Sequence, residues 1–262
     1  MKAASKVYTA LLFVFLFAPI VILLVFSFNE AKSLSVFSGF SLKWYHELLN
    51  DEATLESVRN TLLLAVSAMV ISTVMGTAAS VGIYRLRSRW LRSALNTVTD
   101  IPMTNPDIIT GISLMLMFVF VGRLFGLSQS LSFWTMLIAH VTFCLPYVIL
   151  QVLPKLNQMD PALPEAAQDL GCTPLRAFFK VTIPEIMPGI LTGAIMAFTM
   201  SLDDFVISYF TSYTDKNLSM VIYSAARKGI EPSIYALSTL MFAAVLTLLL
   251  IINKRGALED VS

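Results

Sequence analysis

The chain has 262 residues, of which 56% are hydrophobic and 13% are charged, and its formal net charge is +1 at pH 7. Soluble domains carry about 25% charged residues, so this composition excludes an ordinary water-soluble protein and indicates a membrane protein. The charge balance gives no reason to expect nucleic-acid binding.

Long uncharged apolar runs follow one another along the chain. A helix needs roughly 20 residues to cross about 30 Å of hydrocarbon. Four of the runs reach this length alone, whereas the third and fifth reach it only when they include Asp107 and the pair Asp203–Asp204, respectively. We therefore predict an all-α membrane protein with six transmembrane helices, at residues 7–28, 61–84, 108–121, 131–153, 186–202 and 233–252.

Between the first two runs lies a longer segment, residues 29–60, in which apolar side chains recur at helical spacing after Ser41. This pattern predicts a short helix with Ser41 as its cap. Two roles stay open for Trp44: it belongs to a helix lying on the outer leaflet, or its aromatic face lines the external mouth of a pathway for an organic cation.

The orientation follows from the Lys and Arg residues in the short flanks, and the four arginines of residues 85–92 weigh most. Placing the N-terminus inside gives eleven basic residues on the cytoplasmic side against seven on the other. We predict that both termini are cytoplasmic. The predicted domains are residues 1–56 (first span and outer segment), 57–255 (a core of five spans) and 256–262 (a cytoplasmic tail).

A polar break is predicted inside the third span, where Asp107 follows Asn105-Pro106. Proline cannot continue the backbone hydrogen bonds of a helix, so carbonyl groups are freed beside two polar side chains. Counting 1.5 Å per residue from Asn96 at the inner surface puts Asp107 about 16 Å deep.

The chain holds His46 and His140 as its only histidines, and Cys144 and Cys172 as its only cysteines. We expect His140 to be hydrogen-bonded by a neighbouring helix. The two cysteines fall in different compartments of the predicted topology, so neither a disulfide nor a metal site is expected.

Residues 161–184, here called the EAA segment, form a polar stretch between the fourth and fifth runs. The pattern Glu165-Ala166-Ala167, three residues, Gly171, nine residues and then Val181-Thr182-Ile183-Pro184 resembles the EAA loop of permease subunits in bacterial ABC importers. It departs from the commonest form only by aliphatic exchanges at Val181 and Ile183. The alternative is an ordinary amphipathic cytoplasmic loop.

This resemblance implies a type I ABC importer permease fold, in which short coupling helices dock into a groove on a separate ATPase subunit. The chain itself has no G-x-x-x-x-G-K-[ST] pattern and no G-x-S-x-G turn, so we expect no enzymatic activity. It should need no cofactor of its own, because ATP and Mg²⁺ would bind to the partner ATPase. The residues expected to contact that ATPase are Glu165, Ala166, Ala167, Asp169 and Gly171.

Asp203 and Asp204 lie about 22 Å from the inner side by the same count, just before Phe205 and Tyr209. An Asp at the bilayer centre costs about 2.5–3.5 kcal/mol, so it normally faces protein, water or a pathway. Neighbouring side chains of a helix point about 100° apart. One of the two carboxylates should therefore face a pathway while the other meets a helix terminus, a partner subunit or headgroup water.

Two separated carboxylates, Asp107 on one helix and Asp203 or Asp204 on another, suit a substrate with amines along a flexible chain. Aromatic side chains would hold its methylene groups and its cationic ends. Purely structural roles for each acid stay open. The predicted pathway residues are Asp107, Asp203, Asp204, Trp44, Phe205 and Tyr209.

Further stretches, Ser41 to Tyr45, Asn105 to Ile108, His140 to Pro146 and Phe198 to Asp204, resemble the PotC-type permeases of spermidine/putrescine importers. The resemblance implies a multi-pass protein of the bacterial inner membrane that works by alternating access. Its partners would be a homologous second permease, two ATPase subunits and a periplasmic polyamine-binding protein. Two alternatives remain: the same fold moving ferric iron, an oxyanion or an opine-like compound, or a membrane scaffold or signalling protein that only shares the fold.

Overall fold

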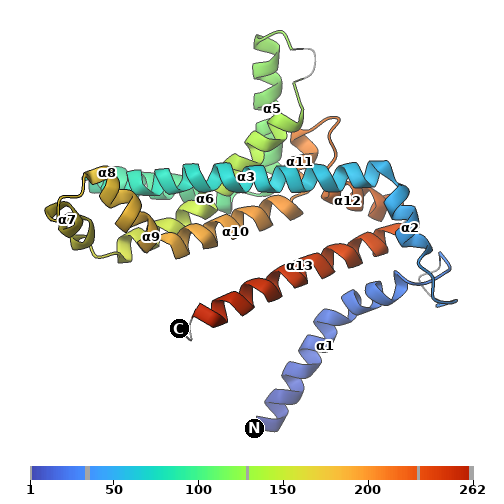
Figure 1. Cartoon of the computed structure of the whole chain (residues 1–262). Coiled ribbons are helices and arrows are strands. Elements are labelled where there is room, and N and C mark those ends of the chain that lie inside the picture. The colour runs from blue at the N-terminus through green and yellow to red at the C-terminus, as the bar shows by residue number, and fades with distance from the viewer. Residues whose placement is uncertain (1, 33–35, 128–129, 229–230, 260–262) are drawn as a thin grey trace. The chain divides into compact units, whose positions relative to one another are not determined.

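Every regular element that the structure describes is a helix (Figure 1), as predicted. The computed structural model describes four ranges of the chain, 2–32, 36–127, 130–228 and 231–259. Contacts divide the chain into two units, and each is described by itself: unit 1 is residues 1–56 with 222–262, and unit 2 is residues 57–221.

The helices follow the predicted apolar runs, with further short helices between them. Unit 1 contains α1 (Lys2–Phe26), α2 (Lys43–Asn50) and α13 (Pro232–Glu259). Two helices cross the boundary between the units, α3 (Glu52–Arg85) and α12 (Leu218–Lys228). Unit 2 contains α4 (Arg89–Thr104), α5 (Asp107–Leu124), α6 (Phe133–Gln158), α7 (Ala162–Asp169), α8 (Pro174–Ala177), a π-helix (Phe178–Thr182), α9 (Ile183–Glu185), α10 (Met187–Asp203) and α11 (Val206–Thr211).

Four of these helices are long and apolar enough to cross a membrane, namely α1, α3, α5 and α6. A fifth span results if α10 is counted together with the segment Pro174–Glu185, from which it is bent by 66°. The sixth expected span falls in α13, where Pro232–Ala244 is apolar but shorter. Six spans and the domain boundaries therefore stay predictions, and residues 260–262 of the predicted tail lie outside the described residues.

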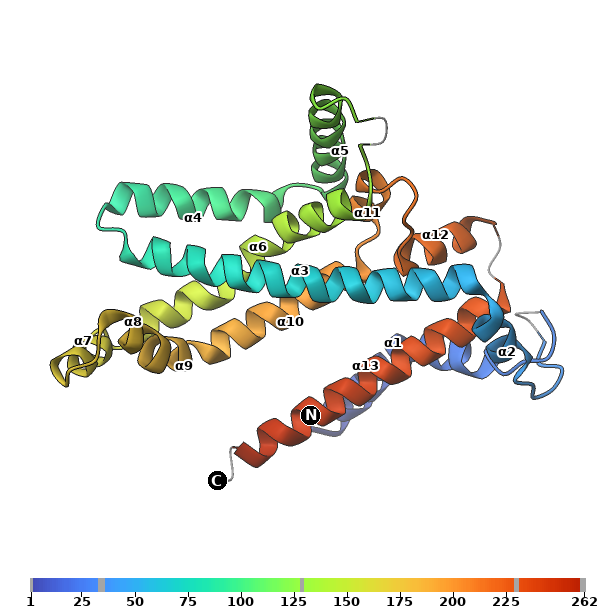
Figure 2. The same cartoon turned by 45° about the horizontal axis from the view of Figure 1, so that its top comes forward.

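The core of unit 2 is a pair of helices, α6 and α10, that lie side by side (Figure 2). The buried residues of α10 recur every fourth position, at Gly189, Gly193, Ala197 and Ser201, so they share one helix face. Small residues on such a face let two membrane helices approach closely. A Cβ atom at Gly189 would lie only 2.8 Å from the carbonyl oxygen of Gln151 in α6.

Val148 of α6 occupies the middle of this core and is fully buried. It lies between two glycines: a Cβ atom at Gly76 of α3 would be 2.7 Å from its Cγ1 atom, and one at Gly193 of α10 would be 3.3 Å from its Cα atom. Close packing of this kind leaves no room for larger side chains on either neighbour.

Replacing Gly193 with valine is therefore expected to destabilise unit 2 by about 1–3 kcal/mol, the usual cost of overpacking a close-packed core. Thermal unfolding of the purified protein in detergent measures the effect. Gly82→Val is the matched control, because a Cβ atom at this helical glycine of α3 would meet nothing within 4 Å. Equal losses in both variants would contradict the close-packing explanation.

The predicted break before Asp107 is confirmed, because α4 ends at Thr104 and α5 begins at Asp107. Asn105 and Pro106 between them have extended ψ angles, and proline disfavours the helical conformation of the residue before it. The Asn105 Nδ2 atom donates a hydrogen bond to Thr110 Oγ1 at 2.9 Å. The depth of about 16 Å for Asp107 assumed one continuous helix. The structure has two separate helices here, so this depth does not apply to Asp107.

Unit 1 contains the predicted short helix of the outer segment, α2. The predicted cap was wrong, because the N-cap residue of α2 is Leu42 and not Ser41. Ser41 lies one position earlier, and its Oγ atom accepts a hydrogen bond from the Lys43 backbone N–H at 3.2 Å. The Trp44 side chain is only 2% exposed, and its Nε1 atom donates to the Asn29 carbonyl oxygen at 2.6 Å. This bond ties α2 to the residues that follow α1.

Candidate functional site

The acidic pair of residues 203 and 204 lies at a break between two helices. α10 ends at Asp203, and Asp204 has an extended backbone conformation before the short helix α11 begins at Val206. The Asp204 carboxylate accepts hydrogen bonds from the backbone N–H groups of Ile207 at 3.2 Å and Ser208 at 2.9 Å. Asp204 therefore caps the start of α11, satisfying donors that have no partner within the helix.

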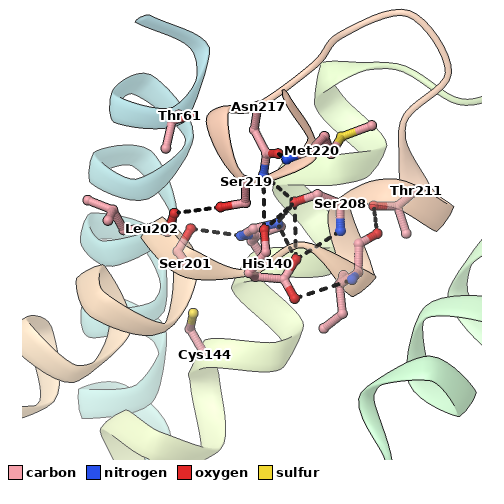
Figure 3. Close-up of polar contacts among 12 residues, drawn as sticks. Thr61, His140, Cys144, Ser201, Leu202, Ser208, Thr211, Asn217, Ser219 and Met220 are labelled. Atoms are coloured by element: carbon pink, nitrogen blue, oxygen red, sulfur yellow. Dashed lines mark hydrogen bonds and ion pairs between the residues drawn. The ribbon is translucent and has the colours of Figure 1, made fainter. Parts of the chain in front are cut away.

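A buried hydrogen-bond network surrounds this cap, with His140 of α6 at its centre (Figure 3). The His140 ring lies 2.7 Å from Ser201 Oγ through Nδ1 and 2.8 Å from Ser208 Oγ through Nε2. The Asp204 carboxylate is 3.4 Å from Nε2, and its side chain is only 6% exposed. The expectation that a neighbouring helix satisfies His140 is confirmed.

The donors and acceptors of this network assign one tautomer to His140. The Ser208 hydroxyl hydrogen has two acceptors on Asp204, Oδ2 at 3.1 Å and the carbonyl oxygen at 3.3 Å, and a hydroxyl that donates to either one can only accept from the imidazole. Nε2 must then carry the proton, and Nδ1 accepts from the Ser201 hydroxyl. A neutral imidazole then forms a hydrogen bond at each ring nitrogen. No buried donor or acceptor of the ring is left without a partner, a state that would cost free energy.

Asn217 joins the start of α12 to the same network. Its Nδ2 atom donates to Ser208 Oγ at 2.7 Å, while its Oδ1 atom accepts from the Met220 N–H at 2.9 Å and caps α12. Next to it, the Leu218 N–H donates to Thr61 Oγ1 of α3 at 2.7 Å. The network therefore fixes the start of α12 against α3, α6 and α11.

Asp203 is in a different position from Asp204, because its side chain is exposed. This confirms that the two carboxylates point in different directions, with Asp204 meeting a helix terminus. Beside them the rings of Phe205 and Tyr209 lie 5.5 Å apart, and the Tyr209 ring is 5.5 Å from that of Phe210. An acid and an aromatic cluster thus occur together at the end of α10.

Asp107 lies in the first turn of α5 and is also exposed. Gly111, one turn later on the same face, packs on α11, where a Cβ atom would come within 3.0 Å of the Phe210 ring. The packing of α5 on α11 therefore brings the helix that carries Asp107 to the aromatic cluster. Neither Asp107 nor Asp203 forms an ion pair within the described residues.

The remaining predicted pathway residue, Trp44, belongs to unit 1 and is buried there. Its ring already has a cation nearby, because the Lys43 Nζ atom lies 5.1 Å from the ring centroid. The structure thus gives Trp44 a packing role in the outer segment.

The EAA segment folds into short helices, as its resemblance implied. α7 carries Glu165, Ala166, Ala167 and Asp169, and it ends before Gly171, whose φ of +91° favours glycine. The Gly171 N–H donates to the Gln168 carbonyl and the Cys172 N–H to that of Ala167, at 2.9 and 3.0 Å, which is the Schellman arrangement of a helix end. Gly171 is therefore needed for the turn itself.

Several large apolar side chains of the EAA segment are exposed, and Leu170 is 88% exposed. The segment is tied to the end of α3, where the Arg85 guanidinium lies 5.9 Å from the Phe178 ring centroid. Exposed apolar patches of this kind mark protein or membrane contacts. The other large exposed apolar residues of the segment are Leu163, Leu175 and Phe179.

Three partners of the network, Ser201, Ser208 and Asn217, were not predicted from the sequence. Ser201 extends the small-residue face of α10 by one turn, and Asn217 is a typical N-cap residue before an apolar helix. These local signals suggest packing and capping. They do not reveal that all three side chains meet at one histidine.

Comparison with known proteins places this geometry in a family. Residues 68–254 match the family described as "Binding-protein-dependent transport system inner membrane component". The chain is 40% identical over 234 residues to the putrescine transport system permease protein PotI of Escherichia coli, covering 89% of this chain and 83% of that protein. It is 35% identical over 240 residues to the spermidine/putrescine permease PotC of Haemophilus influenzae, covering 91% of each.

The fold also matches a solved structure, that of a bacterial ABC transporter for the import of the acidic polysaccharide alginate. The TM-score is 0.73 with 18% sequence identity, covering 98% of this chain and 94% of that one. At this identity the likeness concerns the fold alone, and the fold is that of an ABC importer permease. The chain belongs to the family of inner membrane components of binding-protein-dependent transport systems.

Proposed function

We propose that this chain is a permease subunit of an ATP-driven importer that carries polyamines, putrescine or spermidine, into the cell. The relatives that span about nine-tenths of the chain are named for putrescine and for spermidine/putrescine transport. The proposal does not choose between the two amines.

The observation that carries this proposal is the position of two exposed carboxylates without ion-pair partners in the described residues. Asp107 and Asp203 stand at two separate helix breaks, and α5 and α11, which follow these breaks, pack on each other. A polyamine has ammonium groups separated by methylene groups, so it needs two separated anionic sites. Each ammonium can form charge-assisted hydrogen bonds with a carboxylate.

The aromatic cluster beside Asp203 supports the same class of cargo. Phe205 and Tyr209 offer ring faces to methylene groups and to cationic ends. Asp204 has a positioning role in this proposal and makes no contact with cargo: its cap of α11 directs the aromatic helix and leaves the neighbouring Asp203 carboxylate exposed.

The proposed topology has six spans with both termini and the EAA segment in the cytoplasm. The assembly comprises a homologous second permease, two ATPase subunits that hold ATP and Mg²⁺, and a periplasmic polyamine-binding protein. The exposed apolar side chains around Leu170, next to Glu165 and Asp169, support docking of a soluble partner there. ATP binding and hydrolysis would move this segment and alternate access to the acidic pathway.

The test is uptake of labelled putrescine and spermidine by the full complex in proteoliposomes. Asp203→Asn and Asp107→Asn are each expected to lower amine uptake about tenfold to a hundredfold at low substrate, since hydrogen bonds to charged groups contribute about 1.5–3 kcal/mol. Asp203→Glu and Asp107→Glu keep the charge and should retain most of the uptake.

Competition by ferric iron, an oxyanion and an opine-like compound provides the control for cargo class. If one of these solutes inhibits the uptake of labelled amine and unlabelled polyamines do not, the proposed cargo is overturned. Undiminished amine uptake in both asparagine variants would refute the role of the two carboxylates in the pathway.

A further inference from the structure

The apolar face of helix α4 points outward, whereas a surface helix of a soluble protein turns its apolar face inward. α4 is amphipathic, packs against α6, and exposes large apolar side chains, among them Trp90, Val98 and Ile101. In a membrane protein the outward apolar face suits lipid or another subunit, and polar groups turn toward a protein interior or a water-filled cavity. The polar side of α4 therefore indicates an interior surface.

A cavity of about 180 Å³ lies on this polar side, between α4 and α6. One wall is apolar and comes from α6, with Leu153 and Pro154 among its residues. The polar part of the lining consists of Asn96, Thr99 and Asp100 from α4 and Asn157 from α6.

The oxygen atoms of the three α4 residues have acceptor capacity that no described residue uses. The Oδ1 atom of Asn96 is buried and has no hydrogen-bond partner among the described residues, which is a costly state for an amide oxygen. The Asp100 side chain is exposed, and its carboxylate has neither a hydrogen bond nor an ion pair among the residues described. Thr99 donates its hydroxyl hydrogen to the Leu95 carbonyl oxygen at 2.9 Å, so toward the cavity this hydroxyl can only accept.

The start of α4 holds Asn157 in place, because the Arg92 guanidinium donates a hydrogen bond to the Asn157 Oδ1 atom. This bond also fixes the end of α6, which leads after Gln158 into the EAA segment. The cavity therefore lies at the end of α6 that adjoins the proposed ATPase contact, in the half of the bundle proposed to face the cytoplasm.

We infer that this cavity is a second binding site for a primary ammonium group of the cargo, which rests on the proposed function. An ammonium has three N–H donors and no acceptor, which matches Asn96 Oδ1, Thr99 Oγ1 and the Asp100 carboxylate. Its methylene chain would lie along the apolar wall from α6. The site would receive the amine after it leaves Asp107 and Asp203, before release into the cytoplasm.

Equilibrium binding of labelled putrescine to the complete complex in nanodiscs, without the binding protein, tests this site. Asp100→Asn is expected to weaken binding about tenfold, because it removes the charge and keeps the shape. Asp100→Glu keeps the charge and should restore most of the affinity.

α4 offers a matched pair of threonines for the control. Thr97 and Thr99 each donate to the carbonyl oxygen four residues earlier, but only Thr99 lines the cavity. Thr99→Val should weaken putrescine binding severalfold, whereas Thr97→Val should bind as wild type does.

The outcomes separate this inference from the proposed function. Wild-type affinity in Asp100→Asn, or equal losses in Thr97→Val and Thr99→Val, would overturn the second site while polyamine transport stands. A wild-type complex that neither binds nor imports putrescine or spermidine would overturn the proposed function and this site with it. Weaker binding in Asp100→Asn and Thr99→Val alone would support the site.

Discussion

Replacing His140 with leucine is expected to lower the free energy of unfolding of the permease by about 3 kcal/mol, the range for breaking a buried polar network. Leucine fills a similar volume but cannot bond to Ser201 or Ser208, and the Asp204 carboxylate loses its nearest ring nitrogen. All these groups are shielded from water, so nothing replaces the lost partner. Denaturant unfolding of the purified chain in detergent measures the change.

His140→Gln is the matched variant for this prediction, because its amide keeps one acceptor and two donors. It should lose clearly less stability than His140→Leu. Equal stability of wild type and His140→Leu would show that the network contributes nothing to folding. A loss of the same size in both variants would mean that the ring shape, and not its hydrogen bonds, is what the core requires.

The second large effect is expected at the EAA segment, where Leu170→Asp should reduce ATP-driven amine uptake at least about tenfold. Burying a leucine side chain in an interface contributes about 1.5–3 kcal/mol, and aspartate would place a charge in the same contact. Leu170 follows α7 and is the most exposed of the large apolar residues in this segment. Uptake by proteoliposomes and recovery of the ATPase with the purified complex measure the effect.

Leu170→Met keeps an apolar side chain of similar volume at this position and should transport at close to the wild-type rate. Because the Leu170 side chain projects into solvent in this structure, neither substitution should change the unfolding of the isolated chain. Full uptake and full ATPase recovery in Leu170→Asp would contradict docking at this surface.

The apolar runs predicted the helices well, because length and the absence of charge are strong signals in membrane segments. The break at Asn105-Pro106 was also predictable, since proline acts locally. The separate helix α4 was not recognised, and its residues from Asn96 onward were counted as part of a span. Its composition is too polar for a simple hydropathy argument, although its two-sided pattern is visible in the sequence.

The candidate site was predicted in part. The difference in direction between Asp203 and Asp204 followed from helix geometry, but which of them turns inward depends on the backbone change after α10. The burial of Trp44 depends on its bond to Asn29, fifteen positions earlier in the chain. Contacts of this kind arise from tertiary packing, which local patterns cannot specify.

The small-residue face of α10 has a consequence for how motion passes through unit 2. α6 and α10 are joined by the EAA segment at one end and meet at the His140–Ser201 bond at the other. Between these two ends, Gly189 and Gly193 contact α6 directly, so the two helices are closely packed along their length. We therefore expect a displacement of the EAA segment to move α6 and α10 together, and with them Asp203 at the far end of α10.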